Sequence, residues 1–90
     1  MARKEKVTKV IDGDTFKTAS RKKSVRLANV DAPEKGKPGS AKATETLRKM
    51  IEDEEVRIET VSRDKYGRAV ANVYKGRESI NKKMQKKLKQ

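Results

Sequence analysis

The sequence predicts an α+β domain in which five short strands curl into a barrel that carries two helices. Most of the chain shows short runs of alternating apolar and polar residues, separated by turn residues, as in half-buried strands. Two segments instead space their apolar residues three or four apart, as amphipathic helices do. Only 32% of the 90 residues are hydrophobic, and so small an apolar inventory suits a closed barrel better than a wide layered fold. We expect residues 1–90 to form a single domain.

Three strands are expected in the first third of the chain, after a basic N-terminal arm at residues 1–6. The expected bounds are 7–11 and 15–18 for the first two strands, with an Asp-Gly-Asp turn at 12–14, and 25–30 for the third. Between the second and third strands, residues 19–23 predict an exposed connection. Two prolines and two glycines make residues 31–39 a loop.

A helix is expected next, with Ser40 as its N-cap. The helix buries one face, which consists of Ala43, Leu47, Met50 and Ile51. The acidic run at residues 52–55 ends it, because negative charge is unfavourable at a helix C-terminus.

The second half of the chain predicts two more strands and a final helix. The expected bounds are 56–61 and 69–74 for the strands, 62–68 and 75–77 for the turns, and about 78–89 for a lysine-rich helix whose apolar side carries Ile80, Met84 and Leu88. The order is therefore β-β-β-α-β-β-α. Five strands with a helix between the third and the fourth are typical of the OB-fold.

The composition excludes several kinds of chemistry. The chain has no cysteine and no histidine, which excludes disulfides, zinc–thiolate sites and any mechanism that uses an imidazole base. No apolar run is long enough to span a bilayer. Residues 1–6 are charged and no apolar stretch follows them, so they do not form a signal peptide. We therefore expect a cytoplasmic protein, with a removed leader left open.

The charge balance favours a polyanionic partner. Lysine and arginine number 25 against 13 acidic residues, a net charge of +12. Such a field attracts nucleic acid or an anionic membrane surface. The charge is unevenly placed, with basic clusters at residues 3–9, 21–23 and 82–89 and an acidic cluster at 52–55.

Three segments carry the charged residues that suggest a site: 10–16 (VIDGDTF), 25–34 (VRLANVDAPE) and 63–69 (RDKYGRA). Together and in this order they resemble the signatures of the staphylococcal nuclease (thermonuclease) family, and the resemblance runs from about Val7 to Met84. It implies an OB-fold and phosphodiester hydrolysis. Larger members of the family continue with a third helix, so a sequence that ends at Gln90 resembles a short form of the family.

Two aspartates suggest a cation site. Asp14 follows the glycine of the first turn, where we expect its side chain to point out of the barrel, and Asp31 follows the third strand. Taken alone, the turn is also a common Asx turn. If the two carboxylates meet, a cation must lie between them, and oxygen ligands favour calcium or magnesium. The resemblance implies calcium, held by Asp14, Asp31 and the carbonyl of Ala32, with Asp12 in the surrounding shell.

Three further residues are candidates for catalysis. Taken alone, Glu34 is a loop carboxylate in water, Arg26 an exposed strand residue and Arg68 a turn residue. The resemblance implies that Glu34 positions or deprotonates the attacking water and that both arginines contact the scissile phosphate. A guanidinium pKa above about 12 makes arginine a poor proton donor, so we expect both arginines to stabilise charge.

Lys65 and Tyr66 match positions at which the family contacts the phosphate on the 3′ side of the nucleotide, although both also suit an ordinary polar turn. The sequence therefore predicts a monomeric, calcium-dependent nuclease that acts on single-stranded DNA, with RNA open as a second substrate. One alternative is an OB-fold module that binds nucleic acid without cleaving it. Another is a basic protein that binds membrane surfaces through its final helix. Retention of all five charged positions favours the enzyme.

Overall fold

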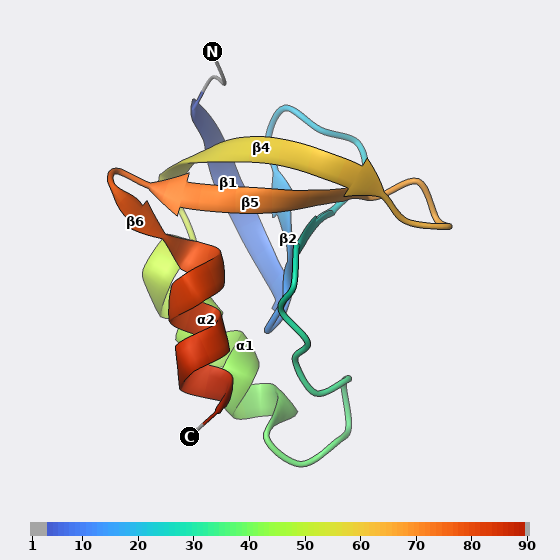
Figure 1. Cartoon of the computed structure of the whole chain (residues 1–90), viewed down its shortest axis with the longest axis vertical. Coiled ribbons are helices and arrows are strands. Elements are labelled where there is room, and N and C mark those ends of the chain that lie inside the picture. Colours follow the sequence, from blue (N-terminus) through green and yellow to red (C-terminus); the bar gives the residue numbers. More distant parts are fainter. Residues whose placement is uncertain (1–3, 90) are drawn as a thin grey trace.

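The first strand bends, so that its two ends belong to different walls of a barrel. In the computed structural model, which describes residues 4–89, the first three residues of β1 (Lys4–Asp12) pair with β4 (Glu55–Arg63). The rest of β1 pairs with β2 (Thr15–Thr18), with two register irregularities along the way. Irregularities of this kind bend a strand, and the bend turns β1 from one wall into the next (Figure 1).

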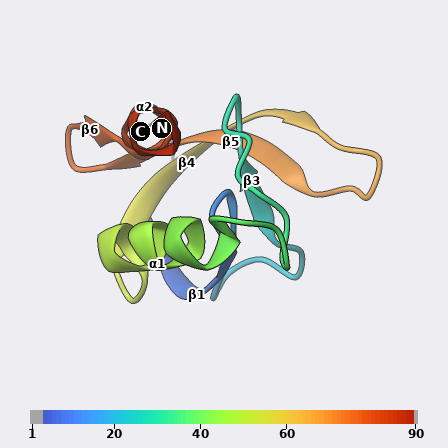
Figure 2. The same cartoon turned by 90° about the horizontal axis from the view of Figure 1, so that it is seen from below.

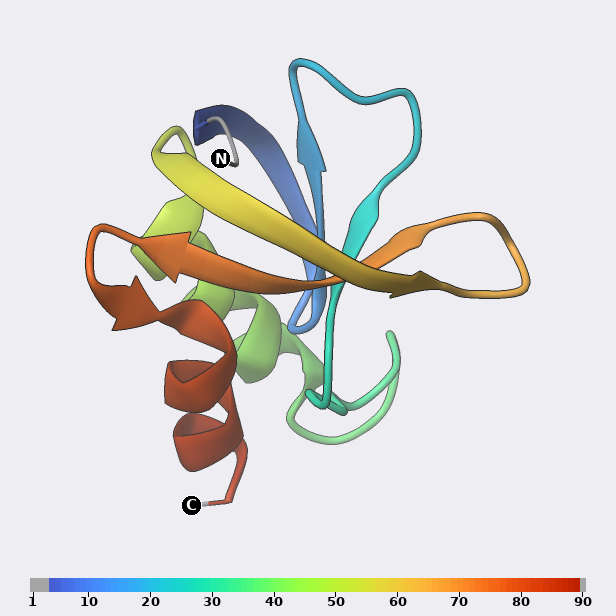
Figure 3. The same ribbon diagram turned by 45° about the horizontal axis from the view of Figure 1, so that its top comes forward.

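Strand β3 (Val25–Leu27) closes the ring. It pairs antiparallel with β2 on one side and parallel with β5 (Ala69–Lys75) on the other, while β5 also pairs with β4. The closed order β1-β2-β3-β5-β4 confirms the predicted five-stranded OB barrel. Figure 3 shows β4 and β5 crossing the first three strands and ending in a hairpin that projects from the barrel.

Two helices lie beside one opening of the barrel, as Figure 2 shows from below. Helix α1 (Ser40–Ile51) buries Ala43, Leu47 and Ile51, and α2 (Ile80–Leu88) buries Ile80 and Met84. These side chains join the apolar residues of the strands in one core, on which Met50 and Leu88 pack at the edge. No helix within residues 4–89 has the length and apolar character needed to cross a membrane.

The predicted N-cap of the first helix is wrong. Ser40 is the first helical residue, and Gly39 precedes it with a left-handed backbone (φ 85°) and no side-chain cap. The turn of residues 37–40 explains the difference. Its hydrogen bond from the Ser40 amide to the Lys37 carbonyl places Ser40 in the first turn of the helix. A side-chain cap is present at α2 instead, where the Ser79 hydroxyl accepts from the Lys82 amide.

Several predicted element bounds also differ. Residues 4–6 of the predicted N-terminal arm belong to β1, and residues 1–3 lie outside the described part of the chain. Strand β3 stops before the buried Val30, because Asn29 takes a left-handed conformation (φ 59°). An unpredicted two-residue strand, β6 (Glu78–Ser79), pairs with β5, so the final helix begins later than expected.

The buried amide of Asn81 ties α2 to the closure of the barrel. Its Nδ2 donates to the carbonyls of Ala28 and Ala71 at 2.8 and 3.0 Å, and its Oδ1 accepts from the Val73 amide at 2.8 Å. Ala71 and Val73 belong to β5, and Ala28 follows β3. One side chain therefore satisfies three backbone groups next to the β3–β5 pairing.

We predict that Asn81→Leu lowers the free energy of unfolding by at least about 2 kcal/mol, because it leaves the Val73 amide and the Ala28 carbonyl unpaired, and each such buried group costs about 1–3 kcal/mol. The Ala71 carbonyl keeps its hydrogen bond from the Ala28 amide. Lys82→Ala, an exposed change on the same helix, is the control and should stay within about 0.5 kcal/mol of wild type. Urea unfolding followed by circular dichroism measures both. Equal stability of Asn81→Leu and wild type would refute the role given to this amide.

Candidate active site

The turn between β1 and β2 is pressed against two other parts of the chain. A Cβ added at Gly13 would lie 2.6 Å from the Ala43 Cβ of α1 and 2.8 Å from the Ala32 Cβ. Only glycine allows this close approach. Within the turn, the Asp14 amide donates to Asp12 Oδ1 at 3.2 Å, so the expected Asx turn is present. The packing fixes the place at which Asp14 leaves the turn.

Asp14 is buried, and the expectation of an exposed side chain is wrong. Only 8% of the residue is exposed. Its Oδ2 accepts from the Ala32 amide at 3.2 Å and its Oδ1 from the Thr15 hydroxyl at 2.9 Å, so the carboxylate faces the loop after β3 and not the solvent. Burial raises the pKa of Asp14 and the neighbouring Asp12 adds to the rise, whereas the hydrogen bonds from Ala32 and Thr15 oppose it.

Arg26 brings the two predicted metal ligands together. Its Nη2 lies 3.5 Å from Asp14 Oδ2 and 3.8 Å from Asp31 Oδ1. Because Val25 and Leu27 on either side are buried, alternation puts Arg26 on the outer face of the barrel, as predicted. One guanidinium nitrogen thus lies between a buried carboxylate and the fully exposed carboxylate of Asp31.

The donors at this place fit a hard cation. Calcium and magnesium bind carboxylate and carbonyl oxygens and complete their shells with water. Asp14 and Asp31 supply two carboxylates, and the peptide of Ala32 lies against the first of them. Within residues 4–89, no three acidic side chains gather in a group that could hold a metal ion, so any metal here would need carbonyl and water ligands as well.

Arg68 belongs to a second cluster, in the turn between β4 and β5. Its Nε donates to Asp64 Oδ2 at 2.6 Å, and the backbone amides of Tyr66 and Arg68 donate to Asp64 Oδ1. Although desolvation favours the neutral carboxyl, these hydrogen bonds lower the pKa of Asp64. Arg68 and Lys65 also lie over the exposed Tyr66 ring, 5.4 and 5.2 Å from its centre.

The barrel seam, the β3–β5 pairing, brings the two clusters near each other. Val25 pairs with Ala69 and Arg26 with Val70, so Arg68 precedes the first paired residue of β5. The burial of Ala69 puts Arg68 on the outer face, where Arg26 also lies. Lys23 bridges the seam, since its Nζ donates to the Tyr66 carbonyl at 3.4 Å.

The structure does not join every predicted residue to the site. Glu34 is exposed, and its side chain makes no hydrogen bond or ion pair within the described residues; its carbonyl accepts from the Lys37 amide in a turn. Two residues with structural roles were missed. Asp64 holds Arg68, and Lys23 contacts the turn. The sequence contained a signal for Asp64, because an acidic residue four positions before an arginine in a short turn can contact that arginine. It contained no signal for Lys23, which looks like any other lysine in a basic run.

At the seam of this OB barrel, carboxylate oxygens that suit a cation lie beside guanidinium groups that suit an anion. The fold and the site therefore define a class of small OB-fold domains with charged groups of both signs at the seam. Comparison with known proteins narrows this class. Residues 24–87 match the family described as Staphylococcal nuclease homologue. The chain belongs to the staphylococcal nuclease family, in agreement with the resemblance of its three segments.

Three relatives illustrate the membership. The chain is 38% identical over 84 residues to an uncharacterized endonuclease of Haemophilus influenzae, covering 90% of this chain and 47% of that protein. It is 33% identical over 91 residues to a thermonuclease of Staphylococcus hyicus, with 90% and 54% covered, and 34% identical over 70 residues to a micrococcal nuclease of Shigella flexneri, with 76% and 40% covered. The chain thus spans about half the length of these relatives.

We predict that the Asp64–Arg68 pair is lost in acid. A lowered pKa means that folding favours the ionised form. The stabilisation is therefore present above the pKa of Asp64 in the unfolded chain and lost as the pH falls through the lowered folded value. The chemical shift of the Arg68 Nε–H should change as the pH falls through the lowered pKa of Asp64, and Asp64→Asn should show no such change.

Arg57 is the internal control, because its pair with Glu59 is longer and exposed, so the chemical shift of its Nε–H should change much less with pH. An Arg68 signal that Asp64→Asn leaves unchanged would show that Asp64 does not hold this arginine.

Proposed function

We propose that this chain is a calcium-dependent nuclease that hydrolyses phosphodiester bonds in single-stranded DNA, with RNA as a second substrate. One observation carries the proposal: Arg26 lies between Asp14 and Asp31 on the outer face of the seam. Membership in the staphylococcal nuclease family supports it, as do relatives named endonuclease and thermonuclease. A net charge of +12 suits a polyanionic substrate.

The carboxylates and the arginines have separate tasks in this proposal. Asp14, Asp31 and the Ala32 carbonyl would hold the calcium ion, with Asp12 supporting Asp14 through the turn. When bound, calcium neutralises the charge of the phosphate and polarises its oxygen. With the two carboxylates on the ion, the Arg26 guanidinium would be available to donate to the scissile phosphate.

Charge on the phosphate oxygens grows as the phosphorus becomes pentacovalent, and preorganised donors that meet this charge lower the barrier. Arg26 supplies one such donor group. Arg68 supplies another, held in place by Asp64. Glu34 is free of protein partners within the described residues and positions or deprotonates the attacking water. Lys65 and the exposed Tyr66 contact the phosphate on the 3′ side.

The alternatives have less support. A membrane-binding final helix needs a free apolar face, but Ile80 and Met84 are buried and Leu88 packs on the core. A module that binds nucleic acid without cleaving it needs the positive surface but has no use for a carboxylate pair around Arg26. The monomeric state and the cytoplasmic location stay predictions from the sequence.

The proposal predicts that the protein cleaves single-stranded DNA with calcium and stops when the ion is chelated. Asp31→Asn should slow cleavage at limiting calcium by at least about 10–100-fold, the loss typical even of residues that only support a metal ligand. Asp31 suits the test because its exposed side chain can change without disturbing the core.

Asp53→Asn is the control, because it makes the same charge change at an exposed turn between α1 and β4. A gel assay of a labelled oligonucleotide measures each rate. Cleavage that survives complete chelation would reject the carboxylate pair as a metal site. Binding without cleavage under any divalent cation would favour the non-catalytic module.

A further inference from the structure

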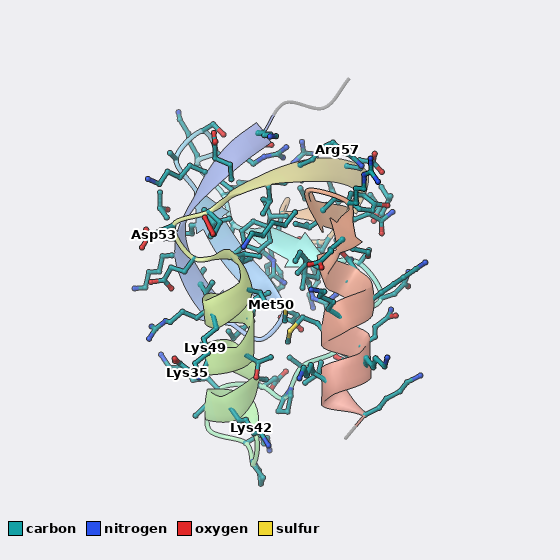
Figure 4. The ribbon with its side chains drawn as sticks, turned by 90° about the vertical axis from the view of Figure 1, so that its left-hand side faces the viewer. Lys35, Lys42, Lys49, Met50, Asp53 and Arg57 are labelled. Carbon is teal, nitrogen blue, oxygen red and sulfur yellow. The ribbon has the colours of Figure 1, made fainter. Side chains whose placement is uncertain are left out.

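A groove runs between the two helices on the side of the molecule seen in Figure 4, where α1 and α2 stand next to each other. It encloses about 1070 Å³. Its floor includes Met50, Met84 and Leu88, and Figure 4 shows Met50 between the helices. Met84 is fully buried and the other two are half-buried, so the apolar surface is recessed.

The edges of the groove are strongly basic. Its rim lysines are Lys42 and Lys49 from α1 and Lys83, Lys86 and Lys87 from α2. None of the described residues that line it is acidic. Lys83 forms an ion pair with Glu78, and the other four rim lysines form no ion pair within residues 4–89. Several like charges around one groove attract an anionic ligand and repel a cationic one.

The groove begins beside the candidate active site. Pro33 lines it, and Pro33 directly follows Ala32, whose amide holds Asp14. The same proline lies against Gly39 at the start of α1, 3.7 Å from the position of an added Cβ. The loop of residues 31–39 therefore forms a short bridge from the seam to the mouth of the groove.

We propose that this groove is a second binding tract for single-stranded nucleic acid, which holds the part of the strand that extends past the seam. The inference rests on the proposed function and adds where a long substrate binds. The rim lysines meet the phosphates, and the half-buried Met50 and Leu88 of the floor accept sugars and base edges. Lysine contacts phosphate as a point charge without geometric selection, so the tract binds strands irrespective of sequence.

Other occupants match the groove less well. A bilayer needs apolar side chains that protrude, yet the exposed large hydrophobic residues between residues 4 and 89 are Ile11, Val61 and Tyr66, none of which lines the groove. A second copy of this chain carries the same net charge of +12 and is repelled. The phosphate backbone supplies the regularly spaced negative charge that two facing rows of lysine require.

The test compares two variants that lose the same charge. One changes all five rim lysines to glutamine. The control changes five exposed lysines on and near β1 and β2, namely Lys4, Lys6, Lys9, Lys17 and Lys22. Binding is measured with a chelator present, by fluorescence anisotropy across a salt series. The probes are a dinucleotide, as the short reference, and a strand of about 16 nucleotides, the upper site size of OB folds.

For the longer strand, the rim variant should flatten the slope of log K against log salt by about 0.7 for each lost contact, or about 2 if three lysines contact phosphates. The control should flatten it by less than half as much. Both variants should cleave the dinucleotide in calcium at the wild-type rate. The rim variant alone should lose the preference for the longer strand.

Equal slope changes in the two variants would overturn the proposal, as would a rim variant that loses affinity only for anionic vesicles or only for its own dimer. The nuclease proposal fails separately. If the long strand binds through the rim lysines but is never cleaved, the tract stands and the catalytic role falls. If cleavage proceeds and the rim variant binds like the control, the nuclease proposal stands and the groove is not a binding tract.

Discussion

The parallel pairing of β3 with β5 is the interaction on which the rest of the structure depends. It closes the barrel, and its register brings Arg26 of β3 close to the start of β5, which Arg68 directly precedes. A slip of one residue would turn Arg26 into the core and Leu27 out of it, because strand side chains alternate between faces. Asn81 secures the pairing from α2 by satisfying backbone groups on both sides. A buried amide on the last helix thus supports a site on the barrel surface.

The electrostatics of the seam explain how so basic a protein can offer a cation site. The body carries a net charge of +12, yet Asp14 is buried and has a raised pKa, so its negative charge is incompletely compensated. Arg26 supplies part of the compensation at 3.5 Å. If Asp14 and Asp31 held the proposed cation, the Arg26 guanidinium would be available to a phosphate. The same cluster therefore suits both partners of the proposed reaction.

The sequence predicted the barrel because alternation and helical spacing are local signals that core residues such as Leu47 and Met84 follow closely. It predicted Arg26 and Asp31 at the site through recognisable segments. It failed where the outcome depends on the exact course of the backbone in turns and loops. Asp14 is buried against the loop after β3, where its carboxylate accepts from the Ala32 amide 18 residues away. The expected N-cap, Ser40, is instead the first helical residue, because Gly39 occupies the cap position with a left-handed backbone. Asp64 was overlooked although its spacing of four residues from Arg68 in a short turn allowed the contact that the structure shows.

The central claim is that the seam forms a catalytic site and does more than bind nucleic acid. The measurement that tests it most directly compares Arg26→Lys with wild type on one single-stranded oligonucleotide, with equilibrium affinity measured in chelator and single-turnover cleavage in calcium. If Arg26 meets charge that develops only in the transition state, the rate falls by about 10²–10³ while the affinity hardly changes, since many other cations still hold the strand. Loss of rate and affinity by equal factors would contradict the account and make Arg26 an anchoring residue.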